Sequence, residues 1–194
     1  RQHQETIGQF WKSVGEYLLS YECPSPKIYQ DGLAVDGELG MIIVAEAARR
    51  GSYNHKLILD LVTRGAEIRK TEDIPLLIQE YESMSNLATN IPRQGTPPNE
   101  EDQQASRQRL LEERDSFIAK TINETLKDGE TGILFIGAYH SVLPHLASDI
   151  VVEQMKENSK VKDYFRELFY GHDDNRFKQL ASYMASPVDR AATA

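Results

Sequence analysis

The chain has 194 residues and a formal net charge of -8, with 40% hydrophobic and 27% charged residues. This length and composition predict one soluble globular domain, which we take to span 1–194 as a single α/β unit. The acidic balance argues against nucleic acid as a partner, and no apolar run approaches the roughly 20 residues that cross a bilayer, so no membrane partner is expected.

Helices and short strands alternate along the predicted chain. Apolar residues at three- and four-residue spacings predict amphipathic helices, and Thr71 suits the N-cap of the helix that follows it. In chain order, we expect helices over 4–20, 36–50, 54–64, 73–88, 103–127, 142–158, 161–169 and 176–185, and strands over 27–30, 66–70 and 133–136. The proline-rich polar residues 90–102 predict an exposed loop, and 186–194 a C-terminal tail.

This alternation determines the expected fold class. Strands that are separated by helices are joined by crossovers, which make neighbouring strands parallel and cover both faces of the sheet with helix. The sequence therefore predicts a helix-rich α/β fold with a small, mainly parallel sheet and helices on both faces.

Residues that can carry chemistry follow the ends of the three expected strands. Asp31 follows the first strand, Glu72 and Asp73 follow the second, and His140 follows "GILFIGAY". Because the carboxyl ends of parallel strands share one edge, where ligands bind in open α/β sheets, we expect these side chains to converge. They could hold a divalent metal, with His140 and Asp31 as ligands, or shuttle protons without a metal. The helix expected after His140 could also bind an anion at its N-terminus.

The same residues also have ordinary structural explanations. Asp31 begins a common Asp-Gly turn pair, and the segment from Thr71 to Asp73 suits helix capping. A histidine after a strand is often no more than a loop residue. At the level of the sequence these alternatives stay open.

A second group of candidates lies on the helix expected over 103–127. Arg114 and Asp115 lie about one turn from Leu111 and Ile118, which belong to its expected inward face. One of the two charged residues is therefore expected to point toward the sheet edge, although charged residues on helices more often form a solvated face.

The cysteine content bears on the cellular compartment. Cys23 is the only cysteine, which excludes an intramolecular disulfide and a Cys-rich zinc site and agrees with a cytoplasmic location. Because Cys23 lies among prolines with no helix to lower its pKa, we interpret it as a structural or surface thiol.

One stretch resembles a known motif. "EERDSFIAKTINETLKDGETGILFIGAYH" resembles the closing motif of the TraB/Tiki superfamily, to which erythromycin esterase and the haem-binding ChaN-like lipoproteins are distantly similar. In that motif an E-R-(N/D) signature on a helix leads through a glycine turn into a hydrophobic strand ending in G-x-x-H. Glu113, Arg114 and Asp115 match the first part, and Gly137 and His140 match the second. The wider frame of the chain looks like a family of uncharacterised prokaryotic proteins with no known activity.

The resemblance also implies an early strand that carries its own histidine. No such strand precedes Gln4, so we expect either that the sequence begins after it or that the protein lacks it. A Tiki-like metal site uses both histidines, and half of such a site is then missing from this sequence.

These observations leave three functions open. The first is a hydrolase of a small-molecule substrate, metal-assisted or metal-free. In it His140 is the metal ligand or general base, Asp31 and Glu72 are its carboxylate partners, and Arg114 orients a substrate anion or holds the site together. The second is a ligand-binding or regulatory protein that holds a small molecule or haem at the same edge without turnover. The third is an assembly module that forms a homo-oligomer through its amphipathic helices.

Overall fold

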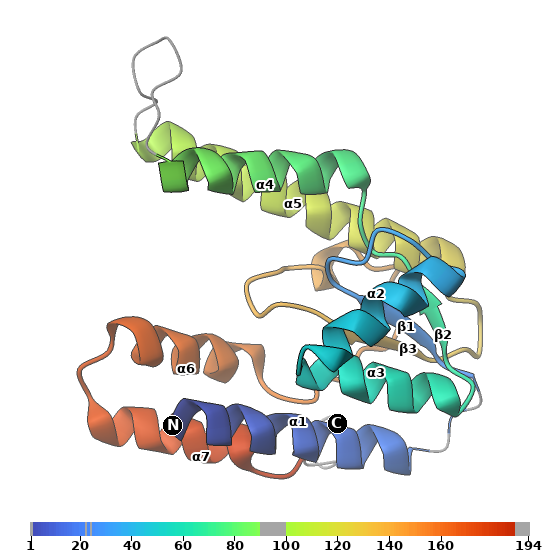
Figure 1. Ribbon diagram of the computed structural model, residues 1–194, viewed down its shortest axis with the longest axis horizontal. Helices are drawn as coiled ribbons and strands as arrows, with labels where there is room; N and C mark the ends of the chain where they lie inside the picture. The colour runs from blue at the N-terminus through green and yellow to red at the C-terminus, as the bar shows by residue number, and fades with distance from the viewer. Residues whose placement is uncertain (1, 22, 24, 90–99, 189–194) are drawn as a thin grey trace. The chain divides into compact units, whose positions relative to one another are not determined.

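The structure, a computed structural model, describes residues 2–21, 23, 25–89 and 100–188 (Figure 1). The chain divides into two compact units, which are taken separately below. Unit 1 comprises 1–25, 43–66 and 149–194, and unit 2 comprises 26–42 and 67–148. The assignment of 1–194 to a single α/β domain stays a prediction.

The described elements are seven α-helices, one short 3₁₀ turn and three strands. The helices are α1 (Gln2–Ser20), α2 (Gly37–Arg49), α3 (Tyr53–Thr63), α4 (Ile74–Thr89), α5 (Glu100–Thr125), α6 (Asn158–Tyr170) and α7 (Asp174–Ala185), and the 3₁₀ turn is η1 (Leu143–His145). The strands β1 (Lys27–Gln30), β2 (Glu67–Arg69) and β3 (Gly132–Phe135) form one sheet in the order β2-β1-β3, with both pairs parallel. This confirms the predicted helix-rich α/β fold. Among the described residues, no helix has the length and apolarity to span a membrane.

Helices pack on both faces of the sheet in unit 2. The Tyr29 hydroxyl lies 2.8 Å from Thr125 Oγ1, so α5 covers the face on which Tyr29 lies. The opposite face carries Ile28 and its pairing partner Ile68, and a Cβ placed on Gly40 of α2 would lie 3.7 Å from the Ile68 side chain. All four residues of β1 are buried, as expected for a central parallel strand covered on both sides.

Backbone hydrogen bonds bring the segments that leave the strands to one edge. The Asp31 amide donates to Phe135 O at 2.9 Å. The amides of Thr71 and Glu72 both donate to Leu33 O, at 2.8 and 3.2 Å. The residues after β1 are therefore tied both to the end of β3 and to the residues after β2.

Unit 1 is helical wherever the structure assigns it regular secondary structure. Helix α1 packs against α3 and α7, and α6 packs against α7. The core surrounds Tyr164, which is fully buried and stacks on Phe177 with ring centroids 5.4 Å apart. Ile7 and Phe10 pack against this cluster, as the apolar stripe of the N-terminal helix predicts.

Several predicted boundaries need correction. Helix α5 begins at Glu100, so the end of the predicted loop 90–102 is helical, and 90–99 lie outside the described residues. Of the predicted tail 186–194, the structure describes 186–188, which are not helical. Thr71 is not the N-cap of α4, because Asp73 Oδ1 accepts the Leu76 amide at 3.3 Å instead.

The helix predicted over 142–158 is wrong. The segment forms the short turn η1 and then runs without regular structure until α6 begins at Asn158. Pro144 lacks an amide hydrogen, and the Asn123 side chain takes up nearby backbone groups: its Nδ2 donates to His145 O at 3.1 Å and its Oδ1 accepts the Ala147 amide at 2.9 Å. The anion site expected at the N-terminus of that helix therefore has no helix to form it.

Candidate functional site

The carboxyl edge of the sheet gathers charged side chains from three strand ends and from α5. Asp31 directly follows β1, Glu72 follows β2, and His140 follows β3. Arg114 and Asp115 come from the middle of α5, and all five residues belong to unit 2. The structure thus brings together the four residues that the sequence proposes, Asp31, Glu72, Arg114 and His140, and adds Asp115 to them.

Arg114 joins two carboxylates that come from different strands. Its Nε and Nη2 donate to the two oxygens of Glu72 at 3.1 and 2.6 Å, and Nη2 also donates to Asp31 Oδ1 at 2.8 Å. The Gly32 amide also donates a hydrogen bond to Glu72 Oε1 at 3.1 Å. Because the Arg114 side chain is only 7% exposed and that of Glu72 is 0% exposed, this ion pair faces the protein interior.

The His140 ring lies between two other carboxylates. Its Nδ1 is 2.5 Å from Asp115 Oδ1, and its Nε2 is 3.3 Å from Asp31 Oδ2. Asp115 is held in turn by the Ser141 amide, which donates to Oδ2 at 2.6 Å. The ring is therefore fixed tightly on the Asp115 side and more loosely on the Asp31 side.

The surroundings shift the pKa values of three of these groups. Burial would raise the pKa of the Asp31 carboxyl, but the hydrogen bond and charge of His140, with the charge of Arg114, lower it to about 2. Burial would lower the pKa of His140, yet its contacts with Asp31 and Asp115 outweigh this effect and raise it. Burial also raises the pKa of Glu72, and Arg114 offsets only part of that rise. Asp31 is therefore ionised at neutral pH, and its charge favours the imidazolium form of His140.

The His140 and Asp31 pair lies beside Gly137. Asp31 is the most exposed acid of the cluster, with a side chain 21% exposed, and Gly137 is itself exposed. A Cβ on Gly137 would lie 3.4 Å from the His140 ring and 3.5 Å from Asp31 Oδ2. Gly137 thus adds no side chain over the two groups, its amide donates to Asp31 Oδ2 at 3.3 Å, and the His140 side chain is 9% exposed.

A divalent metal does not fit this arrangement. Both nitrogens of the His140 ring face carboxylates, and the raised pKa favours the imidazolium, whereas a metal ligand must be a neutral imidazole with a free lone pair. Within the part of the chain that the structure describes, no group of three or more His, Cys, Asp or Glu side chains could hold a metal ion. The metal-ligand role expected for His140 and Asp31 is therefore not supported.

Asp115 is the site residue that the sequence leaves undecided. The pattern on the long helix indicates that either Arg114 or Asp115 points inward, but both are buried. They continue the face of α5 that also buries Ile118, Ala119 and Ile122. Two adjacent charges, each one turn before a buried residue, are the signal that identifies both.

Thr71 stabilises the backbone next to Asp31 through a buried hydrogen bond. It is fully buried, and its hydroxyl donates to Gln30 O, the carbonyl just before Asp31. Thr71→Val keeps the shape and removes the donor, so we expect the free energy of unfolding to fall by about 1 kcal/mol in urea denaturation. Thr71→Ser should restore most of the loss, and Thr63→Val, at an exposed threonine of α3, should have almost no effect. Equal losses at the two threonines would contradict the role assigned to Thr71.

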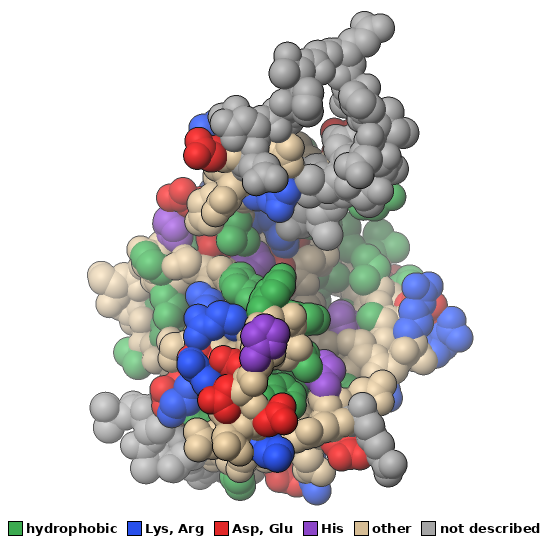
Figure 2. Space-filling view, turned by 90° about the vertical axis from the view of Figure 1, so that its left-hand side faces the viewer, with side chains coloured by type: hydrophobic (Ala, Val, Ile, Leu, Met, Phe, Trp, Pro, Cys, Tyr) green, Lys and Arg blue, Asp and Glu red, His purple; other side chains and the backbone are tan. Residues whose placement is uncertain are grey.

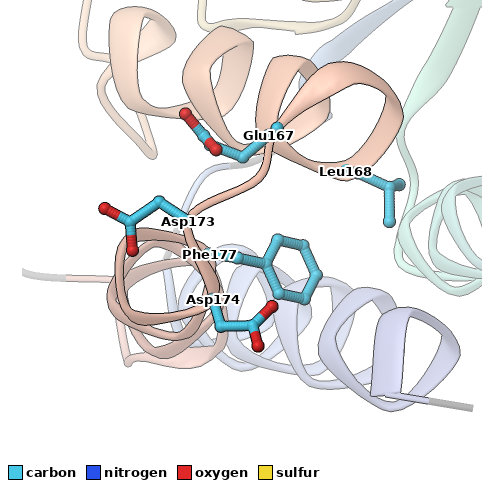
Figure 3. Close-up of a pocket in the computed structure, with 6 residues that line it drawn as sticks. Glu167, Leu168, Asp173, Asp174 and Phe177 are labelled. Carbon is cyan, nitrogen blue, oxygen red and sulfur yellow. The ribbon is translucent and has the colours of Figure 1, made fainter.

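A separate hollow lies in unit 1, at the turn between α6 and α7 (Figure 3). It is lined by Glu167, Leu168, Gly171, Asp173, Asp174 and Phe177. Two of its acids have structural partners: Glu167 Oε1 is 3.4 Å from Arg176 Nε, and Asp173 caps α7 by accepting the amides of Asn175 and Arg176. None of the lining residues belongs to the sheet-edge cluster, and we assign this hollow no role in the chemistry.

Comparisons of the chain with protein-family models, with curated proteins and with solved structures found no match.

Proposed function

We propose that the protein is a hydrolase in which His140 is the general base and water is the nucleophile, with no metal step. The observation that supports this proposal most directly is the His140 ring, held by Asp115 on one side and open to Gly137 and Asp31 on the other. A base that is oriented by a buried carboxylate, and that can still reach solvent, is the minimum arrangement for activating water.

Each carboxylate beside His140 has its own task in this proposal. Asp115 accepts a hydrogen bond from the Nδ1–H group, so it holds the ring in the tautomer whose Nε2 can accept a proton. Asp31 faces Nε2 across 3.3 Å, a longer contact that a water molecule can open. Asp115 is therefore a positioning residue, and Asp31 orients the water and stabilises the imidazolium that forms.

The chemical step is an ordinary base-assisted hydrolysis. Neutral His140 takes a proton at Nε2 from the water, while the water oxygen forms a bond to the substrate carbonyl carbon. The tetrahedral intermediate then collapses, the bond to the leaving alcohol breaks, and the imidazolium returns its proton to that alcohol. The products are a carboxylic acid and an alcohol, and His140 is neutral again. Both ring nitrogens of His140 contact carboxylates, which is why water is assigned as the nucleophile.

Arg114 and Glu72 hold this arrangement in place. The Arg114 guanidinium is occupied by Glu72 and Asp31, so of the two roles considered for it we propose that it steadies the site rather than binds a substrate anion. Glu72 is fully enclosed and cannot reach a substrate from its position. Its proposed role is to fix Arg114 and, through Arg114, the Asp31 carboxylate.

We also propose that the chain is related to the TraB/Tiki superfamily. Support comes from the meeting of the two halves of the motif, which are separated along the chain. Arg114 and Asp115 of the E-R-D signature contact Asp31 and His140, and His140 ends the G-x-x-H signature. A motif whose distant parts make one contact network is more specific than either part alone.

The pH dependence of hydrolysis tests the proposal. Since His140 must be neutral to act as a base, kcat/KM for p-nitrophenyl acetate is expected to rise with pH through a midpoint above 6.5, the ordinary pKa of histidine. Asp31→Asn removes one of the negative charges that raise this pKa, so the midpoint is expected to move to lower pH. The measurement is a pH profile of kcat/KM for both proteins.

The control for this experiment is Asp60→Asn, which changes a carboxylate of α3 in unit 1 and should leave the midpoint unchanged. If kcat/KM fell as pH rose across the same range, His140 would be acting as an acid, and the proposed mechanism would be wrong. If Asp31→Asn left the midpoint unchanged, Asp31 would not influence the pKa of the base.

A further inference from the structure

A continuous series of aromatic rings leads from the core of unit 1 to its surface. Tyr164, which is fully buried, stacks on Phe177 and meets Phe165 edge-on, with ring centroids 5.4 Å apart in both pairs. Phe165 stacks on Phe169 at 6.5 Å, and Phe169 lies 6.3 Å from Tyr170. Phe169 and Tyr170 are 69% and 79% exposed. These two rings, which we call the aromatic pair, therefore lie together at the surface where α6 ends.

The hollow between α6 and α7 adjoins the aromatic pair. Glu167, which lines the hollow, and Tyr170 are three residues apart on α6, a spacing that places two side chains next to each other on one helix face. Figure 3 shows Leu168 on α6 and Phe177 on α7 at this turn, and both line the hollow. Its volume of about 220 Å³ is several times the roughly 30 Å³ that a water molecule takes up in the liquid. The hollow can therefore receive a side chain of a partner.

The hollow is acidic. Its acidic lining residues are Glu167, Asp173 and Asp174. None of the six lining residues found in the described part of the chain is a lysine or an arginine. The two nearby arginines are already paired with acids, Arg166 with Asp163 at 2.6 Å and Arg176 with Asp163 at 3.0 Å. Figure 2, in which the turn between α6 and α7 faces the viewer, shows acidic side chains close to hydrophobic ones. Such a surface attracts a cation and repels an anion.

Exposed aromatic rings beside carboxylates suit a guanidinium group. The face of an aromatic ring is partly negative, and arginine stacks on it while its N–H donors stay free for carboxylates. Cations already lie on rings elsewhere in unit 1, since the Nζ atoms of Lys156 and Lys160 are 5.1 and 4.5 Å from the centroid of the Tyr183 ring. Arginine and aromatic residues are also enriched at the centres of protein interfaces.

We propose that this end of unit 1 binds an arginine-containing segment of a partner protein. The guanidinium lies against the aromatic pair and faces the carboxylates of the hollow, and the apolar part of the segment covers Leu168 and Phe177. The proposal is independent of the hydrolase, because none of these residues belongs to the cluster at the sheet edge.

The test measures the binding of a fluorescent peptide of alternating arginine and leucine by anisotropy. The buffer contains about 150 mM salt, where the screening length is about 8 Å and the net charge of the whole chain has little effect. Tyr170→Ser and Asp174→Asn should each raise Kd about two- to fivefold, the usual effect of losing one exposed cation–π contact or one surface ion pair. The same peptide with glutamate in place of arginine should not bind.

Unit 2 provides the matched controls. Tyr81→Ser and Asp128→Asn change an exposed tyrosine and an exposed aspartate of that unit, and both should leave Kd unchanged. All four substitutions are at exposed positions, so each variant should keep the circular dichroism spectrum of the wild-type protein.

Other results would overturn this proposal. Equal losses of affinity in the variants of the two units would show that the peptide follows the overall charge of the chain. An absence of saturable binding would exclude a basic partner. A dimer in light scattering that Tyr170→Ser disrupts would make the occupant a second copy of the chain. Binding to phosphatidylcholine vesicles that is lost in Phe169→Ser would make it a lipid surface.

Discussion

Arg114→Met is expected to lower the free energy of unfolding by about 3 to 5 kcal/mol at pH 7, the cost of removing one partner from a buried ion pair. The loss is large because Glu72 is fully enclosed, and its carboxylate would keep the Gly32 amide as a hydrogen-bond partner but lose its counter-charge. Methionine fills much of the same volume, so little of the effect comes from a cavity. Urea denaturation followed by far-ultraviolet circular dichroism measures it.

The pH dependence of this loss identifies its cause. Burial already raises the pKa of Glu72, and removal of Arg114 raises it further. An acid whose folded pKa is raised loses stability as pH rises from its unfolded pKa to its folded pKa, so the deficit of Arg114→Met should shrink as pH falls toward 4.5, the ordinary pKa of glutamate. Arg109→Met, which changes an exposed arginine of the same helix, should cost less than about 0.5 kcal/mol at either pH. Similar small losses at Arg109 and Arg114 would show that the buried pair does not hold the site together.

His140→Gln is expected to lower kcat/KM for ester hydrolysis by about 10² to 10⁴-fold, the usual contribution of a general base. Glutamine can still donate a hydrogen bond to Asp115, but it cannot take a proton from water at these pH values. The fold should be retained, because the core of the sheet around Ile28 does not include the His140 side chain. The measurement is the steady-state rate with p-nitrophenyl esters, beside the circular dichroism spectrum of each variant.

A histidine in the same loop provides the matched control. His145 is exposed and contributes its backbone carbonyl to Asn123, so His145→Gln should leave the rate within about twofold. Asp115→Asn should lower kcat and shift the pH profile, since the ring would lose the carboxylate that sets its tautomer. Full activity in His140→Gln would exclude His140 as the base, whatever its position.

Much of the site could be predicted from the sequence because it depends on topology. A parallel sheet sends the residues after each strand to a common edge, and the segments before Asp31, Glu72 and His140 are short, although only 133–136 is a continuous apolar run. The sheet order and parallel pairing then bring these three residues together across distant parts of the chain. Arg114 could be predicted as a site residue because the spacing of Leu111 and Ile118 indicates which face of the helix points inward.

The predictions from the sequence fail where side-chain contacts override the helical pattern of apolar residues. The segment after His140 has enough apolar residues to suggest a helix, but Pro144 and the Asn123 side chain hold its backbone in another conformation. The sequence does not show that Asp115 is buried together with Arg114, because a helical pattern shows which face is inward but not how wide that face is. The metal proposed for His140 and Asp31 depended on residue types alone, and the contacts with Asp115 and Asp31 that occupy both ring nitrogens depend on three-dimensional packing.

The proposed chemistry requires the pairing of His140 with Asp115 and Asp31, and a nuclear magnetic resonance titration of the His140 ring tests this pairing most directly. Comparison with the His140→Gln spectrum assigns the ring signals. The contacts predict a pKa above 6.5 in the wild-type protein and a lower value in Asp31→Asn. A wild-type pKa at or below 6.5, unchanged by Asp31→Asn, would contradict the pairing and with it the proposed chemistry.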